Sequence, residues 1–299
     1  MGNEKTRNLN VEIRKRIGVQ GTGIKAVNYS LTYLSEFAML RLPPTVRRFF
    51  NRMFGTPHER CIVDSAMPLR LNIDPANHAG STLLRTGHYE PETERLFRDH
   101  LRPGDKFLDI GANEGILSAY AGTLVGEQGL VVAIEPQSSL QPLIEITLAL
   151  NGIRPFKIYH RAIGGDEDTS ARINLYPTEN TGQASLVRKP RWGWTTFVQR
   201  SEPIRFISIE RIFTECQIDH FDLVKVDVEG FEHQVVEAML PHITAGRVRK
   251  LLLDYHTPIL RRQGIDPLGI HQSLLDARMQ VRHGNPSDLN SYLLYEFSV

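Results

Sequence analysis

From about residue 101 onward, short apolar runs of strand length alternate with segments of helical spacing. The predicted strands are KFLDI (106–110), GLVVAIE (129–135), FKIYH (156–160), FDLVKVDV (221–228), RKLLLDYH (249–256), MQVRH (279–283) and SYLLYEF (291–297). The predicted helices are Gly115–Leu124, Ser138–Leu150, Ser208–Cys216, Glu232–Leu240 and Pro267–Ala277. This alternation predicts an α/β fold with a mostly parallel sheet covered by helices on both faces. The turn-forming segment Asn285-Pro286-Ser287 predicts that the last two strands form an antiparallel hairpin.

Composition narrows the class of protein. The chain has 299 residues, of which 41% are hydrophobic and 23% charged, as in a soluble globular protein. Lysine plus arginine (35) nearly equal aspartate plus glutamate (34), so we expect no nucleic-acid partner. Two cysteines, Cys61 and Cys216, give no disulfide framework. Because no apolar run approaches the ~20 residues that span a bilayer, we expect a cytoplasmic protein without a transmembrane segment.

The chain before residue 101 has a different character. Residues 1–60 contain VNYSLTYLSEFAMLRL, with apolar positions at helical spacing, then Pro43-Pro44 and the basic segment TVRRFFNRMFG. We predict a helical N-terminal extension packed on the domain, with peripheral membrane contact through residues 29–56 as the alternative. Gly2 and Thr6 satisfy the short myristoylation pattern, which often matches by chance. Residues 61–100 are predicted to be a pre-domain or lid segment, and residues 101–299 the domain that carries the chemistry.

The stretch FLDIGANEG follows the first predicted strand of this domain and favours a ligand site. Gly111, Asn113 and Gly115 occupy alternate positions, and both residue types reach positive φ readily. In an open parallel sheet, ligands bind at the carboxyl ends of the strands, near the point where strand order reverses. Glu135 ends the second strand, 24 residues after Gly111, where an acidic residue accepts both hydroxyls of a ribose. Together these features indicate an adenosine-containing cofactor.

The charges in the turn favour one such cofactor. A dinucleotide site uses G-x-G-x-x-G, but position 116 is isoleucine and Glu114 stands where a phosphate would approach. A carboxylate repels phosphate and suits a cation, and Asp109 adds to the negative potential. Because the sulfonium and ammonium groups of S-adenosyl-L-methionine are cations, the turn is interpreted as a site for its methionine moiety.

Several motifs, taken in order, resemble the FkbM-type methyltransferases. They are RTGHYEPETERLFRDHLRPGDKFLDIGANEG, AIEP, NTGQASL, FDLVKVDVEGFE and LLLDYH, which together extend roughly from Arg85 to His256. The resemblance implies a Rossmann-like class I fold of about seven strands, with 101–299 as the S-adenosylmethionine-dependent methyltransferase domain. It also implies O-methylation of a hydroxyl group on a sugar, polyketide or lipid-linked small substrate. We considered two alternatives, a nucleotide-dependent oxidoreductase and a non-catalytic cofactor-binding scaffold.

The resemblance also carries site residues over to this chain. It implies that Asp109, Gly111, Asn113 and Gly115 form the cofactor loop and that Glu135 binds the ribose. It further implies that Tyr89 and Glu90 fold over the cofactor and that the backbone of Ala162 contacts the adenine. Two positions depart from the family's pattern: Glu210 replaces an aspartate, and Asp254 replaces the commoner glutamate.

Strand periodicity predicts where the methyl acceptor would be activated. Lys225, Asp227 and Glu229 share one face of their strand, and Asp254 and His256 share one face of the next. If the strands are neighbours, two polar stripes meet beside the cofactor, either as a structural ion pair or as catalytic groups. Our hypothesis is that Asp227 or His256 acts as general base, with Lys225 and Glu229 orienting the acceptor.

Two further features left alternatives open. A divalent ion could be held by Asp227, Glu229, Glu232, His233, Asp254 and His256, but their spacing is not diagnostic, and we predict no metal. The irregular segment YPTENTGQASLVRKPRWGWTTFVQRSEP carries Trp192 and Trp194. We interpret it as a wall of the substrate site, with a surface hairpin as the alternative.

Overall fold

The computed structural model describes residues 60–75, 77–165, 167, 169–175, 184, 186 and 200–298. The predicted N-terminal helical extension, its membrane contact, the myristoylation pattern, Trp192 and Trp194 all lie outside these residues. The described chain begins with β1 (Cys61–Asp64), β2 (Arg70–Ile73), α4 (His78–Thr86) and α5 (Pro91–His100). It continues through β3 (Lys106–Ile110), α6 (Ile116–Val125), β4 (Leu130–Ile134), α7 (Gln141–Leu150), β5 (Phe156–Tyr159), β6 (Ser170–Leu175) and β7 (Arg200–Arg205). The last elements are α8 (Ile209–Cys216), β8 (Leu223–Val226), α9 (Glu232–Thr244), β9 (Lys250–Asp254), α10 (Thr257–Arg262), α11 (Pro267–Asp276), β10 (Met279–His283) and β11 (Tyr292–Phe297).

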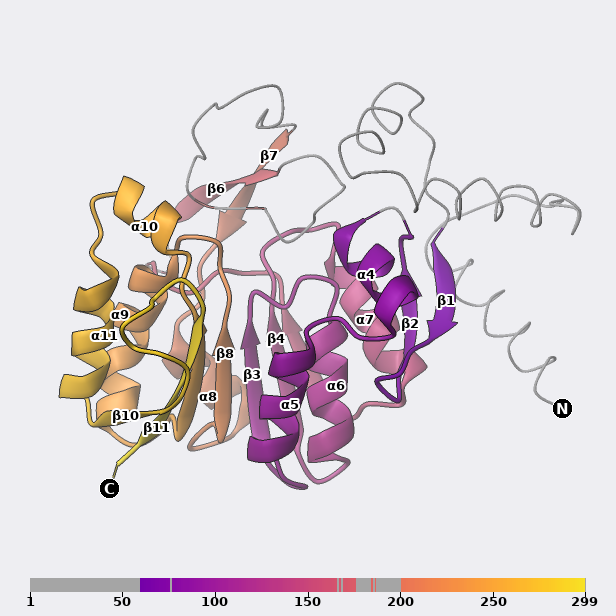
Figure 1. Cartoon of the computed structure of the whole chain (residues 1–299), viewed down its shortest axis with the longest axis horizontal. Helices are drawn as coiled ribbons and strands as arrows, with labels where there is room; N and C mark the ends of the chain where they lie inside the picture. Colours follow the sequence, from indigo (N-terminus) through magenta and orange to yellow (C-terminus); the bar gives the residue numbers. More distant parts are fainter. Residues whose placement is uncertain are drawn as a thin grey trace, which may run out of the picture.

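A seven-stranded sheet forms the centre of the molecule, in the order β10-β11-β9-β8-β3-β4-β5. The pairs formed by β3, β4, β5, β8 and β9 are parallel, whereas β11 runs antiparallel to both β9 and β10. The predicted sheet and its antiparallel hairpin are therefore confirmed (Figure 1). From β3 the chain first builds outward through β4 and β5, then crosses to β8 and β9 on the other side. Strand order thus reverses at β3, where open α/β sheets bind ligands.

Helices cover both faces of the sheet, with α5, α6 and α7 on one side and α8, α9 and α11 on the other (Figure 1). Side chains alternate between these layers along each strand. Leu223 and Leu252 belong to the cluster with α5, α6 and α7, whereas Val224 and Leu253 belong to the cluster with α8, α9 and α11. All four are at most 2% exposed, and each contributes about 1.5–3 kcal/mol by burial. The predicted alternation in these two strands is confirmed.

Tertiary packing sets one helix boundary differently from the prediction. Helix α9 continues to Thr244, past the predicted end at Leu240, although Pro241 lies inside it. A proline removes one helical hydrogen bond. Met239 and Ile243, on either side of it, are fully buried in the core, and the Ala245 N–H still donates to the Pro241 carbonyl. We attribute the extra turn to this burial.

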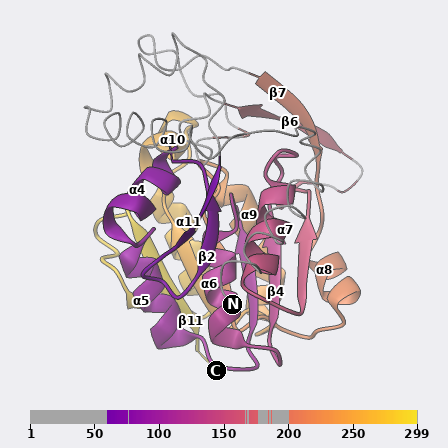
Figure 2. The same cartoon turned by 90° about the vertical axis from the view of Figure 1, so that its right-hand side faces the viewer.

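Two segments that we did not predict in detail pack beside the sheet or beyond its carboxyl end. Within residues 60–100, Leu71 of β2 and Phe97 of α5 are fully buried in the same cluster as α6 and α7. The two-stranded ribbon β6–β7 lies beyond the tops of the central strands in both views (Figures 1 and 2). Ala162, just after β5, pairs with Phe206, just after β7, and so ties the ribbon to the sheet. Within the described ranges, no helix has the length and apolar character needed to cross a bilayer.

Candidate functional site

The loop after β3 has the backbone conformation that its sequence predicts. Gly111, Asn113 and Gly115 have φ angles of 87°, 50° and 75°, so all three lie in the left-handed region. A Cβ atom on Gly111 would stand 1.9 Å from the backbone carbonyl oxygen of Asp227, the residue that follows β8. Glycine is therefore required here by the neighbouring strand, whether or not a ligand is bound. This is a structural cause that our ligand-based argument had missed.

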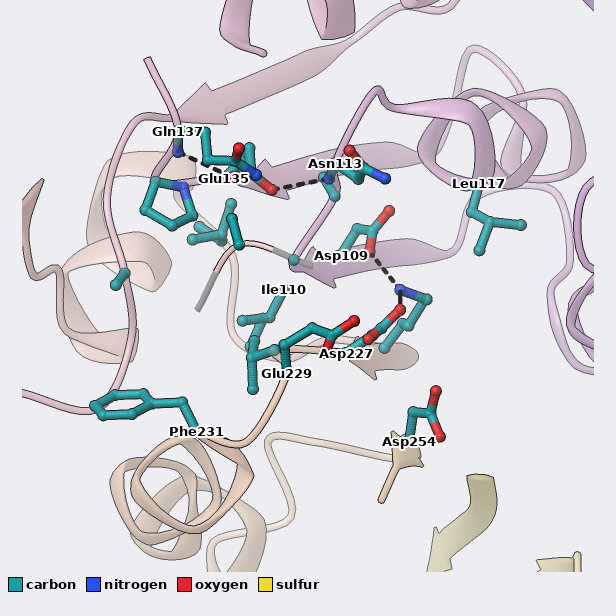
Figure 3. A pocket seen from close by; sticks show the side chains of 18 of the residues that line it. Asp109, Ile110, Asn113, Leu117, Glu135, Gln137, Asp227, Glu229, Phe231 and Asp254 are labelled. Carbon is teal, nitrogen blue, oxygen red and sulfur yellow. Dashed lines mark hydrogen bonds and ion pairs between the residues drawn. The ribbon is translucent and has the colours of Figure 1, made fainter. Parts of the chain in front are cut away.

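Glu135 connects this loop to the loop after β4. One carboxylate oxygen accepts a hydrogen bond from the Asn113 N–H and the other from the Gln137 N–H, each at 2.9 Å (Figure 3). The side chain is 4% exposed. Burial raises the pKa of Glu135 to about 7, against the opposing effect of the two backbone donors. The predicted ribose-binding carboxylate is thus held rigidly at the carboxyl end of β4.

Asp109 lies near the end of β3, just before the loop. It is completely buried, its Oδ2 accepts a hydrogen bond of 2.6 Å from Ser118 Oγ, and its Oδ1 lies 3.5 Å from Lys225 Nζ. Among the described residues, Asp109 Oδ1 and Asn113 Oδ1 are buried without a hydrogen-bond partner. Both residues line the cavity described below. Lys225 lies close to Asp109, but acceptors without a hydrogen bond still fit a ligand that carries ammonium or hydroxyl donors, as S-adenosyl-L-methionine does.

The structure corrects our electrostatic argument about Glu114. Its carboxylate is 2% exposed, pairs with the Arg60 guanidinium at 2.5 Å and accepts a 2.6 Å hydrogen bond from Asn77 Nδ2. A paired carboxylate contributes far less negative potential than a free one, so Glu114 is a weak reason to exclude a phosphate. Sequence patterns gave no signal for Arg60, which is distant along the chain, whereas Asn77 is a recognisable N-cap of α4.

The segment before α5 reaches the same cavity. Tyr89 and Glu90 both line it, and buried Glu94 fixes the segment by accepting from the Tyr89 N–H at 3.1 Å. Glu90 is the N-cap residue of α5 and accepts from Thr93 Oγ1 at 3.0 Å. Burial raises the pKa of Glu90 to about 7, and it raises the pKa of the Tyr89 phenol as well.

Ala162 also lines the cavity, but its backbone is already engaged. Its N–H donates to the Arg205 carbonyl at 3.0 Å, and its carbonyl accepts from the Ile207 N–H at 2.9 Å. The Ala162 N–H is therefore not available for the adenine, and a contact between the Ala162 backbone and the adenine stays a prediction. Glu210, by contrast, does not line the cavity. It lies on α8 with its side chain 61% exposed and pairs with Arg247 at 2.6 Å.

Lys225 and Asp227 form a charged pair where β8 ends, as the predicted polar stripe requires. Lys225 is 5% exposed, and its Nζ lies 3.3 Å from Asp227 Oδ2 and 3.5 Å from Asp109 Oδ1. Burial favours neutral lysine, but the charges of Asp227 and Asp109 raise the pKa of Lys225. Burial likewise opposes ionisation of Asp227, yet Lys225 and then His256 lower its pKa. Asp227 is therefore a carboxylate at neutral pH.

His256 follows β9 and faces the same carboxylates. Its Nδ1 lies 2.8 Å from Glu232 Oε1, and its Nε2 lies 3.8 Å from both Asp227 Oδ1 and Glu229 Oε1. Burial alone would lower the pKa of His256, but the hydrogen bond to Glu232 and the surrounding carboxylates raise it to about 9. The hypothesis of His256 as general base requires an ordinary histidine pKa. An imidazolium cannot accept a proton, so Asp227 is the better candidate.

Asp254 completes the cluster and bears on the metal alternative. Asp227, Asp254 and His256 offer ligand atoms that all lie within 4.8 Å of one another. Burial, then the charge of Asp227, raises the pKa of Asp254 to about 6. The Lys225 ammonium already supplies a cation beside Asp227. His233, which we had grouped with these residues, is instead partly exposed on α9 and pairs with Glu237 at 3.4 Å.

One cavity of about 260 Å³ joins the two halves of the site. Of the predicted site residues, it is lined by Tyr89, Glu90, Asp109, Gly111, Asn113, Glu135, Ala162, Lys225, Asp227, Glu229 and His256, but not by Gly115. Figure 3 shows Asp109, Asp227 and Glu229 directed toward a common space, with Glu135 and Asn113 beyond them. Residues that we had not predicted also line it, among them Gln137, Arg161 and Phe231. The last two come from loops whose position depends on tertiary packing.

The fold and this cavity define the class of protein. A sheet of this order, a left-handed loop after β3 and an acid after β4 are those of a class I S-adenosyl-L-methionine-dependent methyltransferase. The family model of the "Methyltransferase FkbM domain" matches residues 109–278, more than half of the chain. The protein therefore belongs to the FkbM methyltransferase family, and S-adenosyl-L-methionine is its cofactor. The oxidoreductase alternative is thereby excluded.

Individual proteins are similar over shorter spans or at lower identity. The ribosomal protein L11 methyltransferase of Thermus thermophilus is 43% identical over 74 residues, which are 23% of this chain and 27% of that protein. The chain thus spans about a quarter of this curated relative. A TehB-like SAM-dependent methyltransferase from Corynebacterium glutamicum matches with a TM-score of 0.42 and 11% identity, over 73% of this chain and 94% of that chain. Fibrillarin from Aeropyrum pernix, solved with natively bound S-adenosyl-L-methionine, matches with a TM-score of 0.38 and 9% identity, over 69% and 73%.

Proposed function

We propose that this methyltransferase transfers the methyl group to a hydroxyl oxygen of a sugar, polyketide or lipid-linked small substrate, with Asp227 as the general base. The observation that carries the proposal is the position of Asp227. Its backbone N–H donates to the Ile110 carbonyl at 3.0 Å, so the residue lies directly beside the cofactor loop. Its carboxylate lines the same cavity as Asp109 and Glu135.

The residues that would hold the cofactor are those at the carboxyl ends of β3 and β4. Asp109 offers an acceptor for the ammonium group, and Glu135 offers acceptors for the ribose hydroxyls. Tyr89 and Glu90 line the same cavity, as residues that fold over the cofactor would. S-Adenosyl-L-methionine, when bound there, supplies an electrophilic methyl group. The protein must then orient the acceptor oxygen, exclude water and take up one proton.

Asp227 is suited to take up that proton. Lys225 keeps the carboxylate ionised, and 28% of the Asp227 side chain remains exposed to the cavity. When the acceptor oxygen bonds to the methyl carbon, the sulfur–methyl bond would break, S-adenosylhomocysteine would leave, and the hydroxyl proton would pass to Asp227 Oδ1, the oxygen that lies nearer to His256. His256 and Glu229 are placed to hold the acceptor beside Asp227. Positive charge on His256 also disfavours protonated, cationic groups at its Nε2.

A second candidate acceptor is an amino group of a protein. It is favoured by the excess of acidic side chains at the end of the cavity beside β8 and β9. There, Glu90, Asp227, Glu229 and Asp254 outnumber Lys225 and His256. The matched relative's name, a methyltransferase of a ribosomal protein, is consistent with such an acceptor. The same acidic excess disfavours a polyanionic acceptor, so the absence of a nucleic-acid partner stays our prediction.

Incubation of the full chain with a cell extract and a deuteromethyl donor tests these proposals. Mass spectrometry of the small-molecule, lipid, protein and RNA fractions shows where the labelled methyl group goes. We expect label in a neutral hydroxylated small molecule or lipid, and none with the Asp227→Asn variant. Label on protein amines would replace the first candidate by the second, and label in RNA would contradict both.

A further inference from the structure

The last residue of the DVEGFE stretch, Glu232, is an acid that is completely buried. It opens α9 and is 0% exposed. A buried carboxylate is costly unless it is hydrogen-bonded or paired with a charge. Among the described residues, its Oε2 has no hydrogen-bond partner. Its interactions therefore concentrate on the other oxygen, Oε1.

Oε1 of Glu232 makes two contacts that connect two strand ends. It accepts from the Gly230 N–H at 2.9 Å and lies 2.8 Å from His256 Nδ1. Gly230 belongs to the turn after β8, and His256 follows β9. One oxygen atom thus holds together the two loops that carry Asp227, Glu229 and His256.

The turn on the β8 side depends on this support. Glu229 and Gly230 have φ angles of 51° and 99°, so two consecutive residues are left-handed. A Cβ on Gly230 would stand 2.3 Å from Ile259 Cγ2, and Gln263 Nε2 donates to the Gly230 carbonyl at 2.7 Å. Glu232 holds the N–H of the same residue. The turn that aims Glu229 into the cavity is therefore fixed from both sides.

The ring of His256 is fixed by the same oxygen. With Nδ1 directed at Glu232, Nε2 must point the opposite way, toward Asp227 and Glu229, at 3.8 Å from each. These separations are longer than a hydrogen bond, which leaves Nε2 positioned to donate to an oxygen of the acceptor. The charged groups that face His256 are Glu232 from α9, Asp227 and Glu229 from the turn after β8, and Asp254 from β9.

We propose that Glu232 is a positioning residue, which holds His256 so that Nε2 donates a hydrogen bond to the acceptor oxygen beside Asp227. This inference rests on the proposed function, because it assumes that the acceptor binds at this end of the cavity. Glu232 does not line the cavity itself and so acts through His256. Misalignment of the acceptor oxygen by about 1 Å is expected to slow methyl transfer about 10²-fold.

The variant Glu232→Gln tests whether Glu232 positions His256 or only supports the fold. A glutamine carbonyl in the place of Oε1 keeps both hydrogen-bond contacts but removes the negative charge, whereas Glu232→Ala removes the contacts as well. Glu237→Gln is the matched control, since Glu237 lies five residues further along α9 and its side chain is 60% exposed. Thermal unfolding and binding of S-adenosylhomocysteine establish that each variant is folded.

Steady-state methylation of the identified acceptor is the first measurement. We expect kcat to fall about 10²-fold in Glu232→Ala and about tenfold in Glu232→Gln. KM and the affinity for S-adenosylhomocysteine should stay within threefold of the parent, and Glu237→Gln should have no effect. Equal kcat in the parent and both Glu232 variants, with all proteins folded, overturns the proposal.

Nitrogen-15 NMR of histidine-labelled full chain, bound to S-adenosylhomocysteine, is the second measurement and needs no acceptor. The His256 signals are assigned by their loss in His256→Gln. We expect both ring nitrogens to carry protons in the parent at pH 7.5 and the neutral form to grow in Glu232→Gln. Unchanged His256 signals in Glu232→Gln overturn the proposal even if Asp227 proves essential. Changed signals uphold the link between Glu232 and His256 even if the acceptor is not a hydroxyl.

Discussion

The two ends of the cavity hold their carboxylates in different ways. At the cofactor end, both oxygens of Glu135 accept from backbone N–H groups, those of Asn113 and Gln137. At the acceptor end, Asp227 is held by the side chains of Lys225 and His256. Backbone donors are fixed by the local turn, whereas charged side chains depend on several elements packing together. The cofactor end is therefore held rigidly by the backbone. The acceptor end is a network of ionisable side chains, whose protonation can change when a ligand binds.

The largest effect should come from removing the charge at the acceptor end. Asp227→Asn keeps the size of the side chain but deletes the proposed base, so methyl transfer is expected to fall about 10²–10⁴-fold. The affinity for S-adenosylhomocysteine should change less than threefold, because Asp109 still faces Lys225. The deuteromethyl assay and calorimetry measure the two quantities. Full turnover in Asp227→Asn would contradict the assignment of Asp227 as the base.

The close contact between Gly111 and the Asp227 carbonyl can be disrupted by adding a single carbon atom. Gly111→Ala places a Cβ 1.9 Å from the Asp227 carbonyl and forces alanine to a φ of 87°. We expect a loss of about 3 kcal/mol or more in the free energy of unfolding. Gly104→Ala is the matched control, because Gly104 has a φ of 91° but no atom within 4 Å of its Cβ position. Chemical denaturation should show about 1–2 kcal/mol for the control; equal losses in both would remove the steric argument.

A smaller effect, with a dependence on pH, is expected at the cofactor end. The pKa of Glu135 in the ligand-free protein is about 7, and the carboxylate form is the one that accepts from ribose hydroxyls. Affinity for S-adenosylhomocysteine should therefore fall as the pH decreases through about 7, toward a tenfold loss at pH 5.5. Glu135→Gln should bind about tenfold more weakly at pH 8 and lose this dependence. Calorimetry across pH 5.5–8.5 measures both, and a flat profile for the parent would contradict the assignment.

Chelation should have the smallest effect. Lys225 supplies the positive charge beside Asp227, so we expect methyl transfer to stay within twofold after dialysis against EDTA. Loss of activity that added Mg²⁺ or Mn²⁺ restores would instead assign a metal to Asp227, Asp254 and His256. The acceptor end would then resemble a metal centre rather than an ion-pair network.

The same contrast explains what the sequence could predict. The seven strands, the left-handed positions at Gly111, Asn113 and Gly115 and the acid at Glu135 depend on periodicity and on turns of a few residues. Those features are local. The sheet confirms the strands, the φ angles confirm the left-handed positions, and Glu135 directly follows β4, whereas its contact with the ribose stays a prediction. The Arg60–Glu114 pair joins residues 54 positions apart, and the pKa of His256 depends on Glu232 from another element. No local pattern contains such information, so Glu114 was interpreted as free and His256 as an ordinary histidine.

The Asp227 carbonyl stands where a side chain on residue 111 would begin. The loop after β3 and the proposed base, Asp227, are consequently held in register by two adjacent strands, β3 and β8. If Asp227 is the base, exchange of the loops around the cavity mouth could change the preferred acceptor without altering that register.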